Sequence, residues 1–131
     1  MKASNLFLNL NSDDPMRLYN FYHDVVGLDV QPDSGQYALQ LSPGVTLGFD
    51  GHSEVHGRAK EPARILVDLF VDDIAAAEDE LRARGVTFLR SQGVEYWGGI
   101  ISTFEDPDGN YLQVIQYDPS KAQMPEAATS A

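Results

Sequence analysis

The chain has 131 residues, which is enough for one domain with a substantial core or for two small modules that share one. Its 20 acidic and 9 basic residues give a formal net charge of −11, which disfavours binding to nucleic acids and to anionic membranes. The absence of cysteine excludes disulfides, thiolate metal sites and a cysteine nucleophile. No stretch is apolar enough to span a bilayer and the start lacks the apolar core of a signal peptide, so we expect a cytoplasmic protein.

The first feature along the chain is one half of a weak internal repeat. The stretch "LFLNLNSDD" (6–14) aligns without gaps with "ILVDLFVDD" (65–73). Apolar residues alternate in both stretches and each ends in an acidic pair, which predicts two equivalent strands. Asp14 and Asp73 are placed to cap helices that the apolar spacing predicts over 15–26 and 74–84, and Gly27 and Gly85 to end them.

Beyond each of these glycines the sequence predicts three further strands. They cover 28–32, 37–41 and 45–50 in the first half, and 86–90, 98–105 and 110–117 in the second. The expected fold class is therefore α+β, with two βαβββ modules in tandem at 4–50 and 64–117 that form a single domain over 1–117. A polar linker at 51–63 joins the modules, and a flexible tail follows at 118–131.

Four sequence blocks, together with the repeat, carry a resemblance to a known family. They are "DDP…FYHDVVGL" (13–28), "VDDI…LRARGV" (71–86), "YWGG" (96–99) and "DPDGNYLQV" (106–114). The chain resembles the vicinal oxygen chelate superfamily over about residues 4–117; that superfamily includes glyoxalase I, extradiol dioxygenases, fosfomycin-resistance enzymes and bleomycin-binding proteins. The resemblance implies that the modules curl into an open half-barrel around a cavity, commonly within a homodimer.

The resemblance also implies four metal-ligand positions, one on the first and one on the last strand of each module. Here these positions hold Phe7, Leu66, Gln113 and, within one residue, Gly48. Metal-dependent members have His, Gln or Glu there, because a divalent ion needs three or four such groups. Only Gln113 offers a donor, and an amide oxygen alone is a poor ligand. We therefore expect no metal at the usual site and no other cofactor.

One substitute metal site remains possible in the linker. In "HSEVH" the side chains of His52, Glu54 and His56 would share one face of an extended segment. The alternative is a solvated linker without a metal, which we favour because a loop lacks a firm scaffold for ligands.

A second group of residues is expected to line a ligand cavity. If Leu6, Leu8 and Leu10 pack on the helices, strand alternation turns their neighbours toward the cavity. The predicted ligand-binding residues are Phe7, Asn9, Asn11, Leu66, Phe70, Tyr96, Trp97, Tyr111 and Gln113. For Phe7, Leu66 and Phe70 a place in the core is an equal alternative. Asp68 is the catalytic candidate, since it is the only acid or base on these strands and burial would raise its pKa.

Two functional hypotheses follow from these residues. The first is a metal-independent binding protein of the bleomycin-resistance type, for which a charge of −11 suits an aromatic or cationic ligand. The second is a lyase, isomerase or dioxygenase of the same superfamily that uses a displaced metal, or Asp68 without a metal. We favour binding, and a structural partner domain without any ligand is the third possibility.

Overall fold

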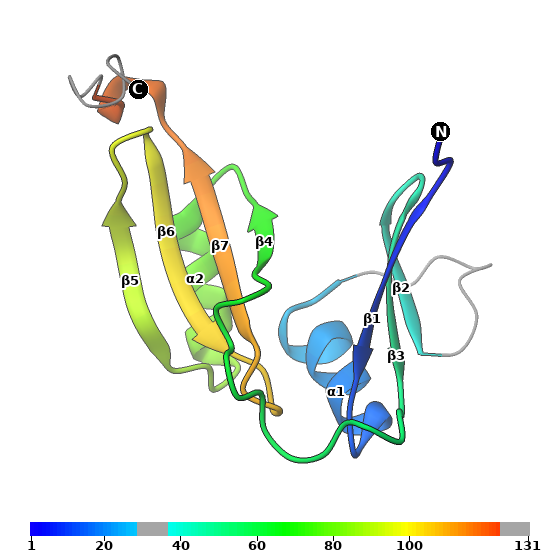
Figure 1. Cartoon of the computed structure of the whole chain (residues 1–131). Coiled ribbons are helices and arrows are strands. Elements are labelled where there is room, and N and C mark those ends of the chain that lie inside the picture. The colour runs from blue at the N-terminus through cyan, green and yellow to red at the C-terminus, as the bar shows by residue number, and fades with distance from the viewer. Residues whose placement is uncertain (29–36, 124–131) are drawn as a thin grey trace. The chain divides into compact units, whose positions relative to one another are not determined.

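The computed structural model describes residues 1–28 and 37–123 of the chain. These residues divide between two compact units, which we describe separately (Figure 1). The first unit comprises Met1–Lys60 together with Asp106–Gly109, and the second comprises Glu61–Glu105 together with Asn110–Ala131. The boundary after residue 60 falls inside the predicted linker.

The first unit contains a three-stranded sheet and one helical segment. In chain order its elements are β1 (Leu6–Asn11), α1 (Pro15–Asn20), a π-helical turn η1 (Phe21–Val25), β2 (Ala38–Ser42) and β3 (Val45–Asp50). The sheet order is β1-β3-β2, with β1 parallel and β2 antiparallel to β3. The strand predicted at 28–32 lies almost entirely outside the described residues, which resume at residue 37.

The helix signals of the first half act as predicted. The Asp14 carboxylate accepts a hydrogen bond from the Arg17 backbone N–H at 3.1 Å, and Pro15 occupies the first helical position. Gly27 has a φ of +86°, the left-handed conformation that ends a helix and favours glycine. The predicted helix over 15–26 is not uniform, however, because α1 passes into the π-helical turn η1 after six residues.

The helix of the first unit covers one face of its sheet. The rings of Tyr22 and Phe49 lie 5.1 Å apart, so Tyr22 packs on β3. The core also contains three leucines, Leu18, Leu39 and Leu47. Leu6 does not join this core, because it lies at the end of the sheet opposite Val45 and is 61% exposed. The expectation that it packs on the helix is therefore wrong, whereas Leu8 and Leu10 are half-buried.

The second unit has the complete βαβββ order predicted for its module. Its elements are β4 (Val67–Phe70), α2 (Ile74–Ala83), β5 (Phe88–Val94), β6 (Gly99–Glu105), β7 (Tyr111–Tyr117) and a short 3-10 helix η2 (Pro119–Lys121). The sheet order is β4-β7-β6-β5, with β4 and β7 parallel. Asp73 accepts a hydrogen bond from the Ala76 N–H at 3.0 Å, and Gly85 has a φ of +93°, so the same cap and stop signals operate here.

The strand register confirms the internal repeat. In both sheets the first strand of the module lies parallel to the last. Asn9 is paired with Gly48 in the first sheet, and Asp68 is paired with Gln113 in the second. Since Asn9 and Asp68 are aligned in the sequence repeat, Gly48 is the counterpart of Gln113, as predicted.

Alternation along β6 and β7 separates the two faces of the second sheet. Ser102 on β6 donates a 2.5 Å hydrogen bond to Glu78 of α2, and Gln116 on β7 accepts one from the Ile74 N–H at 2.9 Å. Even-numbered residues of both strands therefore face α2. Odd-numbered residues face the opposite side, which no helix in the described part of the unit covers and which we call the open face. Its central residues Ile101, Thr103 and Ile115 are buried, so its exposed area lies toward the strand ends and edges.

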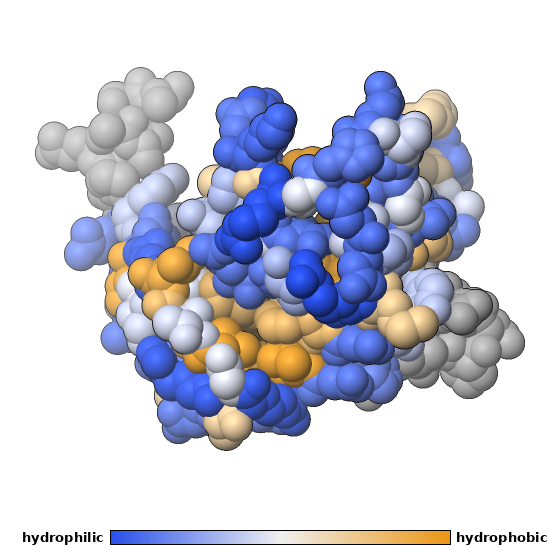
Figure 2. All heavy atoms as spheres, turned by 90° about the horizontal axis from the view of Figure 1, so that it is seen from below, coloured by the Kyte–Doolittle hydropathy of each residue, from blue (hydrophilic) through white to orange (hydrophobic). Residues whose placement is uncertain are grey.

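Figure 2 shows polar residues over most of the visible face, with apolar residues between them. Among the described residues, no helix has the length and the apolar character that crossing a bilayer requires. Of the predicted tail at 118–131, residues 118–123 are described, and Asp118 N–H donates to the Gly98 carbonyl at 2.9 Å. The remaining tail residues lie outside the described part.

Candidate functional site

A row of polar side chains crosses the open face of the second sheet. Strand register places Asp68 of β4 beside Gln113 of β7, Gln113 beside Thr103 of β6, and Thr103 beside Arg90 of β5. Directly paired residues point to the same side of a sheet, so these four residues form what we call the polar row. Within it, the Gln113 amide donates to the Thr103 hydroxyl at 3.1 Å.

Asp68 lies at the β4 end of the polar row. Its predicted burial is wrong, because the residue is exposed. The carboxyl group nonetheless loses part of its hydration, and this desolvation raises the pKa of Asp68 above its ordinary value. Among the described residues, none forms a hydrogen bond or ion pair with Asp68. Its oxygens are therefore free to accept a hydrogen bond from a ligand.

Arg90 closes the polar row on β5, the opposite edge of the sheet. Its Nη2 donates to Glu95 Oε2 at 2.6 Å, which fixes the guanidinium group. The guanidinium group lies over Gly93, and a Cβ atom at this position would lie 2.1 Å from Arg90 Nε and displace it. Neither Arg90 nor Thr103 was predicted as a site residue. The signal for both is the register across β5, β6 and β7, which the sequence does not reveal directly.

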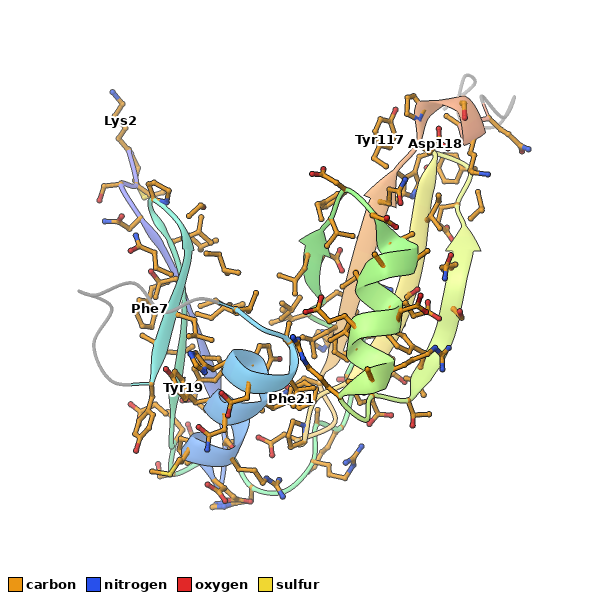
Figure 3. All side chains as sticks on the ribbon, turned by 180° about the vertical axis from the view of Figure 1, so that it is seen from behind. Lys2, Phe7, Tyr19, Phe21, Tyr117 and Asp118 are labelled. Carbon is orange, nitrogen blue, oxygen red and sulfur yellow. The ribbon has the colours of Figure 1, made fainter. Side chains whose placement is uncertain are left out.

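Two stacked aromatic rings lie at one end of the open face. Trp97 stacks on Tyr117 with ring centres 6.3 Å apart and an interplanar angle of 15°. Trp97 also covers Gly99, where a Cβ atom would lie 2.2 Å from the indole ring, and Gly99 is paired with Tyr117. Tyr117 lies where β7 ends, directly before Asp118 (Figure 3). Trp97 was predicted and Tyr117 was not; the other predicted aromatic of this turn, Tyr96, is 58% exposed.

The remaining predicted residues of the second unit lie along β4 and β7. Leu66 and Phe70 are 38% and 66% exposed, so neither belongs to the core. Tyr111, at the start of β7, lines a hollow of about 460 Å³ that also includes Glu61, Pro62, Ala63 and Arg64. At the other end of β7, Phe70 lines a hollow of about 250 Å³ that also includes Val71, Asp72, Gln116 and Tyr117.

The predicted residues of the first unit meet on β1 and β3. The ring of Phe7, on β1 (Figure 3), covers Gly48, where a Cβ atom would lie 2.2 Å from the ring and 2.7 Å from Asn9 Oδ1. Phe7 is 54% exposed, so this ring forms part of the surface. Asn11 is half-buried and is paired with Asp50 at the end of β3. The first unit thus brings Phe7 and Asn9 together over Gly48.

Comparison with known families agrees with this architecture. Residues 6–114 match the family model of the Glyoxalase/Bleomycin resistance protein/Dioxygenase superfamily. The chain belongs to this superfamily.

Solved structures share the superfamily fold with this chain. A protein of unknown function from Agrobacterium tumefaciens is 23% identical, with a TM-score of 0.67 over 90% of this chain and 95% of that one. TnmS3, an antibiotic-binding protein from Streptomyces sp. CB03234, is 24% identical, with a TM-score of 0.66 over 87% and 95%. A glyoxalase/bleomycin resistance protein from Catenulispora acidiphila is 23% identical, with a TM-score of 0.62 over 87% and 98%. No curated protein matches the chain significantly.

The residues at the four superfamily metal positions do not fit a metal. In the first unit, Gly48 has no donor and the Phe7 ring fills the space that a side chain there would take. In the second unit, Leu66 is apolar, and the Gln113 amide nitrogen donates to Thr103, so Gln113 offers only its amide oxygen. A divalent ion would find one amide oxygen where relatives that bind metals offer several stronger donors.

The linker histidines are engaged with other groups. Nδ1 of His56 lies 3.3 Å from Asp13 Oδ1, and its Nε2 lies 3.1 Å from the Ser53 carbonyl oxygen. His52 Nδ1 lies 3.1 Å from the Glu54 backbone nitrogen. Within residues 1–28 and 37–123, no group of three or more His, Cys, Asp or Glu side chains is arranged to hold a metal ion.

The turn "DPDG" at 106–109 belongs to the first unit and is buried there. The Tyr22 hydroxyl donates to Asp106 Oδ2 at 2.8 Å, and Arg17 pairs with Asp108 at 3.1 Å. Desolvation, followed by the negative charge of Asp106, raises the pKa of the Tyr22 hydroxyl, so it remains a donor. The sequence predicts a turn at this point but not its burial. These carboxylates hold the turn in place.

Proposed function

We propose that this protein binds a small organic molecule, aromatic or cationic, on the open face of its second sheet, without the metal of metal-dependent relatives. The polar row carries this proposal. It presents the carboxylate of Asp68, which has no partner among the described residues, and the amide of Gln113, on a sheet face that no described helix of the unit covers. Exposed apolar and aromatic side chains flank the row, namely Leu66, Phe70 and Tyr117. Small-molecule binding sites are usually lined by apolar and aromatic side chains together with a few polar groups that orient the ligand.

Two further observations favour binding without a metal. The superfamily metal positions provide too few ligand atoms for a metal ion, since they hold Phe7, Gly48, Leu66 and Gln113. In addition, TnmS3 shares the fold and binds an antibiotic, so the fold supports ligand binding as a function in itself. The net charge of −11 raises the local concentration of cationic ligands.

A thermal-shift screen tests the proposal, since a ligand that binds the native state raises the melting temperature. Aromatic antibiotics, glutathione conjugates and divalent metal salts should be compared at equal ionic strength. We expect stabilisation by an aromatic or cationic compound, and loss of that shift in Gln113→Ala. Asp79→Asn, on the exposed surface of α2, is the matched control. Stabilisation that requires a divalent ion together with a thiol conjugate would contradict the proposal.

A second candidate function is catalysis, which the raised pKa of Asp68 favours. A carboxylate with a raised pKa is a better proton acceptor near neutral pH than an ordinary one. If the protein is a lyase, isomerase or dioxygenase, Asp68 would accept a proton from a substrate that Gln113 holds. Asp68→Asn should then abolish turnover while substrate binding persists. Unchanged turnover of an identified substrate by this variant would remove Asp68 from the mechanism.

We also propose that the protein is a homodimer. β1 and β4 are edge strands of their sheets, and edges tend to be covered by association. Exposed apolar residues lie on or next to these edges, including Leu6 at 61% and Ile65 at 62% exposure. Light scattering that gives the monomer mass at micromolar concentration would contradict the dimer.

A further inference from the structure

The smaller hollow of the second unit combines aromatic surface with a negative charge. It has a volume of about 250 Å³ and lies where β4 and β7 end. Its lining is Phe70, Val71, Asp72, Gln116 and Tyr117, and we call it the aromatic hollow. Sites for drug-sized ligands occupy about 300–1,000 Å³, so this hollow suits one compact group of a larger ligand.

Two aromatic rings offer free surface in the aromatic hollow. Phe70 is 66% exposed although it is a large apolar residue. Tyr117 is 54% exposed even though Trp97 stacks on it, with ring centres 6.3 Å apart. Tyr117 also lines the hollow, so part of its exposed area faces this space. Faces of aromatic rings carry partial negative charge and attract cations.

Asp72 adds a full negative charge to the aromatic hollow. It is exposed, and among the described residues none donates a hydrogen bond to its carboxylate or forms an ion pair with it. The lining contains no lysine, arginine or histidine. Gln116 is committed through Oε1 to the Ile74 N–H, at 2.9 Å, so its carbonyl serves as part of the helix cap.

An anion is a poor occupant of the aromatic hollow, because an uncompensated carboxylate and two ring faces all repel it. A neutral apolar group would gain contact with Phe70 but would leave the charge of Asp72 unused. A cation with an apolar surface satisfies both features, as methylated ammonium groups do in aromatic cages. Attraction by a chain with a net charge of −11 acts in the same direction.

We propose that the aromatic hollow binds the methylated ammonium group of the ligand, with Phe70 and Tyr117 contacting the methyl groups and Asp72 balancing the charge. This inference rests on the proposed function, since it assigns one end of the ligand that the open face holds. It narrows the ligand from "aromatic or cationic" to a compound that carries a tertiary or quaternary amine. A neutral aromatic compound of the same size is excluded as the preferred ligand.

The chain provides its own reporter for this site. Trp97 is its only tryptophan, and it stacks directly on Tyr117 of the aromatic hollow. Choline is a suitable probe because 3,3-dimethylbutan-1-ol has the same shape without the charge. Titration with choline chloride should change the tryptophan fluorescence saturably. The alcohol and sodium chloride should produce no saturable change over the same concentration range.

Variants separate the contributions of ring and charge. Phe70→Leu keeps apolar bulk without the ring, and Asp72→Asn keeps the shape without the charge; each should weaken choline binding by about tenfold. Asp79→Asn should leave the choline response unchanged, because Asp79 is exposed on α2 and does not line the aromatic hollow. Circular dichroism should confirm that each variant is folded.

The possible outcomes distinguish this inference from the proposed function. Equal responses to choline and to the alcohol, or an unchanged affinity in folded Asp72→Asn, would overturn the ammonium site. If choline gives no response while a compound from the screen still binds through Gln113, the ammonium site is wrong and the proposed function stands. If a neutral compound binds with a dependence on Phe70 and Tyr117 but not on Asp72, the hollow recognises rings rather than ammonium groups.

Discussion

Replacing Glu78 by glutamine removes a buried charge from the interface between α2 and the second sheet. The side chain of Glu78 is 4% exposed. Its Oε1 accepts hydrogen bonds from Arg82 at 2.9 Å and from Ser91 at 2.6 Å, while Oε2 accepts from Ser102 at 2.5 Å and from Gln92 at 3.4 Å. Desolvation acts to raise the pKa of Glu78, but the hydrogen bonds from Ser102, Ser91, Arg82 and Gln92 outweigh it and lower the pKa to about 2.

The pKa shift gives the size of the effect. A fall from the ordinary value of 4.5 to about 2, at about 1.4 kcal/mol for each pH unit, corresponds to at most about 3.5 kcal/mol of stability. Glutamine fits the same space but turns an NH2 group toward the amide nitrogen of Gln92, which can only donate. We therefore expect Glu78→Gln to lower the free energy of unfolding by about 2 to 3 kcal/mol at neutral pH.

The pH dependence provides a sharper test than the magnitude. Because the folded-state pKa of Glu78 is depressed, its contribution is complete above pH 4.5 and is lost as the pH falls toward 2. Between about pH 5.5 and about pH 3.5 the wild type should lose about 1.3 kcal/mol more than the glutamine variant. Urea unfolding followed by the fluorescence of Trp97, which lies in the second unit, measures both quantities.

A matched control lies two residues further along the same helix. Glu80 forms an ion pair with Arg84 at 2.6 Å, but its side chain is 61% exposed. Glu80→Gln should therefore change the free energy of unfolding by less than about 1 kcal/mol, because exposed ion pairs contribute little. If Glu78→Gln shows the same small loss, or the same dependence on pH as the wild type, the reasoning from the buried carboxylate is refuted.

Three further substitutions test other contacts. Tyr22→Phe should lower the free energy of unfolding by about 1 to 3 kcal/mol, measured by urea unfolding, because Asp106 loses a buried hydrogen bond; unchanged stability would show that the bond contributes nothing. Gly98→Ala should lower the melting temperature clearly, since a Cβ atom there would lie 2.6 Å from a backbone oxygen and the φ of +95° disfavours alanine; equal melting temperatures would contradict the described turn. Gly48→Ala should cost less than Gly98→Ala, because the colliding atoms belong to the half-exposed ring of Phe7 and to the exposed side chain of Asn9, both of which can rotate away; a larger loss than in Gly98→Ala would show that these side chains are fixed.

Local signals in the sequence are sufficient to predict much of the fold. The caps at Asp14 and Asp73 and the stops at Gly27 and Gly85 each depend on hydrogen bonds or φ values within a few residues, and all four are confirmed. The repeat extends this local information to the register, so that Gly48 could be identified as the counterpart of Gln113.

Long-range contacts are the part that the sequence does not predict. Tyr22 and Asp106 are 84 residues apart, and neither residue carries a signal for the other. The pairing of β5 with β6 shifts register twice, once on each side of Arg90, and these shifts place Arg90 beside Thr103 in the polar row. Gln92, which lies within the second shift, has a φ of +48°. An irregular strand breaks the alternation from which faces are read, so Arg90 and its neighbours could not be assigned to a face in advance.

The two modules use equivalent strand positions in opposite ways. At the position shared by Gly48 and Gln113, the first module has no side chain and the ring of Phe7 fills the space, whereas the second presents an amide beside an unpaired carboxylate, Asp68. In a fold built from two similar modules, a polar group at this strand position in one module is enough to contact a ligand. The equivalent position in the other module can then form part of an apolar surface. Under the proposed function, polar recognition of the ligand therefore falls to the second module, and the first module offers no donor at this position. This asymmetry explains why Gln113→Ala is expected to abolish binding, whereas substitution of Phe7 is expected to alter only apolar contact.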